Sequence, residues 1–121
     1  MHCMKDVSEK CSQGSISFII VFIKHIEELL EDLENRYAFF RSVKDDPETV
    51  DGDVVKNALI LCRRNSKEMV FYQKQLSKWE QGEQGDQQSL LEIFSQKLSA
   101  TKKLNAILLD LVMHILEQQI K

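Results

Sequence analysis

Apolar residues recur along three long segments of the chain at alternating spacings of three and four. This spacing keeps one face of a helix directed at a neighbour over its whole length, so each segment predicts an amphipathic helix. We call the three sets of positions the apolar stripes. They are Ile16, Ile19, Ile23, Ile26, Leu30, Leu33, Tyr37 and Phe40; then Val55, Ala58, Cys62, Asn65, Met69, Tyr72, Leu76 and Trp79; and finally Leu91, Phe94, Leu98, Thr101, Asn105, Leu108, Val112 and Ile115.

The stripes predict an all-α fold with helices over about 15–43, 53–80 and 89–120. Helices of this length joined by short connections lie antiparallel to their neighbours in sequence, so we expect a three-helix antiparallel bundle, possibly completed by dimerisation. Residues 1–14 have no apolar period and are expected to form a flexible tail. Ser15 is the expected cap of the first helix, and Ser89 with Glu92 has the spacing of a capping box for the third.

The first connection carries its own helix signals. Asp46-Pro47-Glu48 places a proline after a capping residue, which favours a short helical turn. Asp51 or Asp53 then caps the second helix. The second connection, over 81–88, is polar and contains two glycines, which is typical of a loop.

Composition supports a single ordinary folded domain. The chain has 121 residues, of which 43% are hydrophobic and 29% charged, and only 4 are Gly and 1 is Pro. So few turn-forming residues argue against a β fold with many turns. The formal net charge of −3 argues against a general nucleic-acid binder, because such proteins have a basic excess.

The cysteines favour a reduced, intracellular (cytoplasmic) protein. Cys3, Cys11 and Cys62 are odd in number, and Cys62 lies on an apolar helix face, so they do not form a disulfide framework. The apolar run over 16–23 is too short to span a bilayer, which takes about 20 residues. We therefore expect no membrane span.

No catalytic, cofactor or metal motif is evident. The chain has no Gly-rich phosphate loop and no paired-carboxylate signature, and no His falls near Cys62 to activate it. His25 with Glu28 and His114 with Glu117 each share a helix face, but the two pairs fall toward opposite ends of a bundle. We therefore predict no enzymatic activity, no cofactor and no metal.

Two asparagines occupy stripe positions where apolar residues are expected. When the second and third helices are aligned from their loop, Asn65 arrives opposite Asn105. Two buried amides at one level can satisfy each other, and a polar pair in a helix interface fixes register. The alternatives are exposed amides, or the polar floor of a ligand pocket.

The first helix carries more apolar residues than one bundle face needs. We call the residues off its main stripe the apolar surplus: Phe18, Ile20, Val21, Phe22 and Leu29. Such a surface is buried inside the monomer, pairs with a second copy in a homodimer, or binds another helical protein. We take these five residues as the candidate partner-binding site.

A small basic cluster lies on the second helix, formed by Arg63, Arg64 and Lys67. It could contact a phosphate backbone, which makes a nucleic-acid-associated factor one alternative function. The simpler interpretation is a solvated face that forms salt bridges with the acidic side of the first helix.

The sequence therefore favours a non-enzymatic protein–protein interaction module, such as an adaptor, assembly subunit or chaperone, that binds a partner helix. The segment over 104–109, followed by a Gln-rich end, loosely resembles the C-terminal helix of small flagellar and type III export chaperones. That resemblance implies a helical protein that holds a partner's terminal helix. The alternatives are a ligand-binding bundle with a polar level at Asn65 and Asn105, and the nucleic-acid factor described above.

Overall fold

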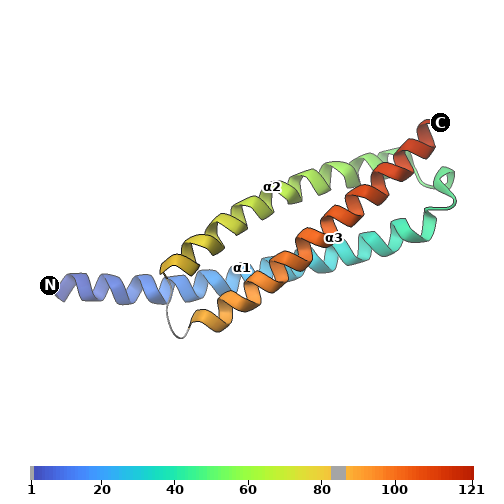
Figure 1. Cartoon of the computed structure of the whole chain (residues 1–121). Coiled ribbons are helices and arrows are strands. Elements are labelled where there is room, and N and C mark those ends of the chain that lie inside the picture. The colour runs from blue at the N-terminus through green and yellow to red at the C-terminus, as the bar shows by residue number, and fades with distance from the viewer. Residues whose placement is uncertain (1, 83–86) are drawn as a thin grey trace.

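The chain forms an all-α bundle of three long helices, as predicted (Figure 1). The computed structural model describes residues 2–82 and 87–121, with side chains from residue 16 onward in those ranges. Helix α1 spans His2–Val43, the short 3-10 helix η1 spans Pro47–Thr49, α2 spans Gly52–Gly82 and α3 spans Gln88–Ile120. Helix α2 runs antiparallel to α1 and α3 (Figure 1).

Helix α3 is the central element of the bundle. Its backbone packs closely against both α1 and α2, whereas α1 and α2 hardly approach each other at the backbone level. Contact between α1 and α2 is instead made by long side chains, such as the rings of Phe22 and Trp79, whose centroids are 5.3 Å apart. The third apolar stripe, on α3, therefore packs against both α1 and α2.

The apolar stripes form the core. All eight positions of the third stripe are buried, and so are all positions of the second except Trp79, which is half-buried. In the first stripe, Ile16, Leu30 and Tyr37 are half-buried and the other five positions are buried. The spacing of three and four residues thus predicted the buried faces correctly.

The core divides into two clusters along the bundle. The aromatic cluster, near the α2–α3 connection, contains Ile19, Ile23, Ile26, Met69, Tyr72, Leu76, Leu91, Phe94 and Leu98, with Phe22 and Trp79 packed against it. The aliphatic cluster, near η1, contains Leu33, Phe40, Val50, Val55, Ala58, Cys62, Leu108, Val112 and Ile115. Three buried polar residues of the stripes fall between the two clusters in sequence and form a polar level: Asn65, Thr101 and Asn105.

The connection from α1 to α2 follows its sequence signals. Pro47 occupies the first turn of η1, as predicted. Asp51 caps the start of α2. Its Oδ1 accepts from the N–H of Asp53 at 3.0 Å, and its carbonyl accepts from the N–H of Val55 at 3.3 Å. Gln119 of α3 holds the connection in place: its Nε2 donates to the carbonyls of Pro47 at 3.0 Å and Val50 at 2.7 Å.

Two predicted helix starts differ from the structure. Helix α1 begins at His2, well before the expected boundary at Ser15 and through the segment expected to be a flexible tail, because that segment holds helix formers and no proline. Helix α3 begins at Gln88, so Ser89 lies inside the first turn and its predicted capping role is wrong. The middle of the predicted second connection, residues 83–86, lies outside the described residues.

Within the described part of the chain, no helix combines the length and apolarity needed to cross a membrane.

Candidate functional site

The apolar surplus of α1 is divided between the core and the surface. Phe22 packs against the aromatic cluster and Leu29 against the aliphatic cluster, so both mainly serve the interior. Phe18, Ile20 and Val21 remain exposed, and Phe18 leaves 60% of its surface accessible. The burial alternative therefore accounts for two of the five residues and leaves three unexplained.

An aromatic surface crosses from α1 to α2 at this end of the bundle. Phe71 of α2 has its ring centroid 5.9 Å from that of Phe22. Phe18 is four residues before Phe22, so it lies one helical turn earlier on the same side of α1. Phe71 is half-exposed and also lies 5.8 Å from Tyr72. We call Phe18, Phe22 and Phe71 the aromatic surface. The stripe pattern did not identify Phe71, because it lies off the stripe of α2.

The polar level is built differently from the expected pair of amides. Asn65 and Asn105 are both buried, each with 2% of its surface accessible, but no hydrogen bond joins them. Asn105 Nδ2 donates instead to the carbonyl of Cys62 and to Ser66 Oγ, both at 3.1 Å. Asn65 Nδ2 and Asn105 Oδ1 have no partner. Thr101 Oγ1 donates to Lys97 within α3 and does not join the amides.

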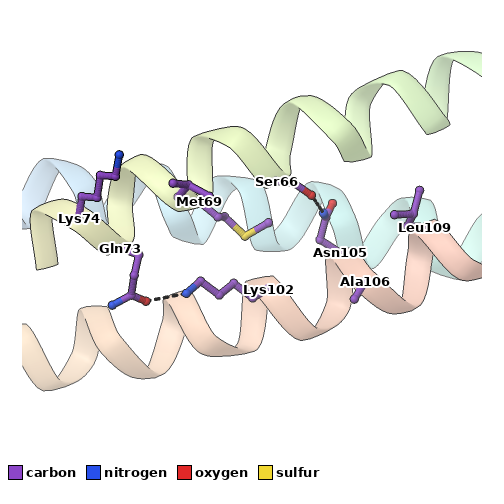
Figure 2. Close-up of a pocket in the computed structure, with 9 residues that line it drawn as sticks. Ser66, Met69, Gln73, Lys74, Lys102, Asn105, Ala106 and Leu109 are labelled. Carbon is purple, nitrogen blue, oxygen red and sulfur yellow. Dashed lines mark hydrogen bonds between the residues drawn. The ribbon is translucent and has the colours of Figure 1, made fainter. Parts of the chain in front are cut away.

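Asn105 also lines a groove between α2 and α3 (Figure 2). The groove has a volume of about 410 Å³, and its surface is predominantly apolar. Its lining comes from two helices that run in opposite directions. The residues are Ser66, Met69, Val70, Gln73 and Lys74 of α2 with Lys102, Asn105, Ala106 and Leu109 of α3.

The two ends of this groove differ in chemistry. Lys74, Gln73 and Lys102 lie at one end, and Lys102 Nζ donates to Gln73 Oε1 at 2.6 Å (Figure 2). Ala106 and Leu109 lie at the other end, with Asn105 between the two ends (Figure 2). No acidic side chain lines the groove. The groove thus combines an amide, a serine hydroxyl and two lysine side chains with an apolar wall.

One residue of the predicted basic cluster lines a pocket. Arg64 lines a small pocket between α1 and α2 together with Arg36, whereas Arg63 and Lys67 do not line it. The ion pair found within the described residues joins Arg36 Nε to Asp32 Oδ2 at 2.8 Å, inside α1. The expected salt bridges from the cluster to α1 are therefore not formed among these residues.

Cys62 has the environment of a core residue. It is fully buried in the aliphatic cluster, and burial raises the pKa of its thiol, an effect partly offset by the positive charge of Arg36. A raised pKa favours the neutral thiol, which is the less reactive form. Burial also raises the pKa of Tyr72, and the negative charge of Glu68 adds to that shift. Among the residues that the structure describes, no group of three or more His, Cys, Asp or Glu residues could hold a metal ion.

Comparisons of the chain with protein-family models, with curated proteins and with solved structures returned no match. The aromatic surface and the α2–α3 groove are two surfaces of the bundle that could bind a partner or a ligand.

Proposed function

We propose that this protein is a non-enzymatic interaction module that binds an apolar helix face through the aromatic surface and the adjoining Val21. The observation that carries the proposal is the exposure of Phe18 and Phe71 beside a core that already accommodates Phe22. Large apolar side chains grouped on a surface are typical of an interface, where aromatic residues contribute most of the binding energy.

A second copy of this chain is the partner that we propose. The segment over 11–23 contains no charged residue, so two copies could bring their α1 helices together without like-charge repulsion. A twofold contact pairs one surface patch with itself, and an uncharged apolar patch is self-complementary. Ile20 and Val21 extend the apolar area around α1, which widens the face available to a partner helix.

The test is the solution mass by light scattering over a range of protein concentrations. We expect a dimer for the wild type and a monomer for Phe18→Asp, because a charge placed in an apolar interface loses its hydration without gaining a partner. Phe39→Asp is the matched control, because Phe39 is an exposed phenylalanine on the same helix, toward its other end. It should remain dimeric.

Circular dichroism must show that Phe18→Asp keeps its helical content. Phe22→Asp is unsuitable for this purpose, because Phe22 contacts four aromatic rings and its replacement would disturb the fold. A wild type that is monomeric at every concentration would contradict self-association. A dimer that survives Phe18→Asp and Phe71→Asp together would show that another surface makes the contact.

A further inference from the structure

A small pocket between α1 and α2 is lined by two arginines from different helices. It has a volume of about 270 Å³, and a larger share of its surface is polar than in the α2–α3 groove. Its lining consists of Arg36 of α1 and, from one face of α2, Asn57, Ile60, Leu61 and Arg64. None of these residues is acidic, so the pocket has cationic side chains without a carboxylate in its own wall.

The guanidinium of Arg36 is oriented from within α1. Its Nε donates to Asp32 Oδ2 at 2.8 Å, one helical turn earlier. A guanidinium has N–H groups on all three of its nitrogens, so those on the two Nη atoms remain for another acceptor. Burial raises the pKa of the Cys62 thiol and the charge of Arg36 partly offsets that rise, so this guanidinium lies close enough to α2 to act on it.

Arg64 has no counter-charge of its own. Its side chain is exposed and makes no hydrogen bond or ion pair with another residue that the structure describes. Two like charges that border one small pocket repel each other, and an anion bound between them replaces this repulsion with attraction to both. Asn57, two helical turns before Arg64, adds a side-chain amide that can donate. The pocket therefore favours an anionic ligand.

The number of donors favours a phosphate monoester among the common anions. A carboxylate has two oxygens, and a single arginine can bind both. A phosphate monoester has three terminal oxygens and a charge of about −1.5 to −2 at pH 7, so it can accept from two arginines and an amide together. A phosphodiester of a nucleic-acid backbone has two free oxygens and a single charge. Ile60 is 54% exposed and offers an apolar contact to the organic part of a monoester.

We propose that the pocket between α1 and α2 binds a small phosphate monoester. The phosphate accepts from Arg36, Arg64 and Asn57, and the carbon substituent lies on Ile60. A volume of about 270 Å³ suits a small ligand, since pockets for drug-sized molecules are about 300–1,000 Å³. The pocket is about 20 Å along α1 from Phe22, at about 1.5 Å per residue, so this site does not rest on the proposed self-association.

A titration of the ¹⁵N-labelled protein with phenyl phosphate, followed by NMR, tests the proposal. We expect saturable shifts of the Nε–H signals of Arg36 and Arg64 and of the Asn57 side-chain amide, with one site per chain. Methyl phenyl phosphate is a diester and should bind about tenfold more weakly, because it has one terminal oxygen and one charge fewer. Inorganic phosphate should bind about threefold more weakly, because it has no ring to contact Ile60.

Arginine variants locate the binding. Arg64→Gln should weaken phenyl phosphate about tenfold, because it removes charge-assisted hydrogen bonds from the pocket. Arg64→Lys should also weaken binding, since it keeps the charge but loses the planar fork. Arg63→Gln is the matched control, because Arg63 is exposed on the same helix, carries the same charge and does not line the pocket. It should bind as the wild type does.

Four results would overturn the proposal: no saturable shift with phenyl phosphate, equal affinity for the diester, equal affinity for inorganic phosphate, or equal weakening by Arg64→Gln and Arg63→Gln. The second would favour a nucleic-acid backbone as the ligand. The last would show that the overall charge of α2 attracts the ligand. Circular dichroism on each variant separates a lost site from a lost fold. Light scattering on the same samples measures self-association separately, so either proposal can fail without the other.

Discussion

The two core clusters of the bundle bury similar numbers of side chains by different means. In the aromatic cluster, the rings of Phe22, Tyr72, Trp79 and Phe94 extend between helices, with centroids 5.2 to 6.2 Å apart. In the aliphatic cluster, smaller residues such as Val55 and Ala58 pack beneath a connection that folds back over the end of the bundle. The comparison shows two ways to join a pair of helices that have little backbone contact. Large rings can fill the space between them, or a third helix can bind the segment that connects them.

This difference bears on function. A core built from large rings leaves part of those rings at its edge, and the aromatic surface is such an edge, where Phe71 is half-exposed beside Phe22. At the other end, Gln119 ties the connection to α3 through two hydrogen bonds. The proposed contact with a partner helix is therefore placed at the aromatic end.

The largest expected effect comes from removing a ring from the aromatic cluster. Phe94→Ala should lower the free energy of unfolding by about 3–5 kcal/mol, because Phe94 is fully buried and contacts three aromatic rings from two helices besides its aliphatic neighbours. Leu108→Ala removes a fully buried side chain of the aliphatic cluster and should cost about 2–4 kcal/mol. Urea unfolding followed by circular dichroism measures both. If Leu108→Ala lowered the free energy of unfolding more than Phe94→Ala, the aliphatic cluster would be the one that contributes more to stability.

A substitution in the polar level between the clusters should have a smaller effect, and it should raise the free energy of unfolding. Asn65→Leu should raise the free energy of unfolding by about 1–2 kcal/mol, because it removes a buried amide donor that has no partner. Asn105→Leu is the matched control at the same level, and it should not stabilise, because it breaks the hydrogen bonds to Cys62 and Ser66. If both substitutions stabilised equally, the hydrogen bonds of Asn105 would contribute nothing to the fold.

The smallest expected effect is a dependence of the free energy of unfolding on pH, which comes from Cys62 in the aliphatic cluster. Burial raises the pKa of Cys62 in the folded state above its ordinary value of 9.0, so between these two values the folded chain binds more protons than the unfolded chain. Stability from this thiol is therefore fully present below pH 9.0 and declines as pH rises through the folded-state pKa, by at most about 1.4 kcal/mol per pH unit.

Urea unfolding at pH 8 and pH 9.5 measures this decline, and Cys62→Ala should reduce it. Tyr72 of the aromatic cluster has an ordinary pKa of 10.0 and contributes in the same direction only at higher pH. A decline that is the same in wild type and Cys62→Ala would show that the thiol is not its source.

Sequence spacing predicted the core well because burial in a bundle depends mainly on which helix face a residue occupies. All eight positions of the third stripe are buried, including the two polar ones, Thr101 and Asn105. The sequence limited the cap of α2 to Asp51 or Asp53, and in the structure Asp51 Oδ1 accepts from the N–H of Asp53. The buried face of each helix was thus within reach of the sequence, whereas the first residues of α1 and α3 were not.

Features that depend on the distance between helices were not predictable in this way. The alignment placed Asn65 and Asn105 at one level, but Asn105 instead donates to a backbone carbonyl and a serine hydroxyl, which residue spacing does not reveal. For Phe22, the sequence left burial, self-association and a foreign partner open, and the structure places its ring against the aromatic cluster, between α1 and α2. A ligand pocket at the level of Asn65 and Asn105 was one alternative from the sequence, and of these two residues only Asn105 lines the α2–α3 groove.

The central position of α3 has a consequence for the synthesis of the protein. Helix α3 follows α1 and α2 in the chain, yet it supplies the close backbone packing that each of them makes. A nascent chain that ends before α3 therefore has two amphipathic helices with their apolar faces uncovered and little to hold them together. The two helices can therefore pack fully only after α3 has left the ribosome, and Gln119 near the end of α3 then adds its two hydrogen bonds to Pro47 and Val50.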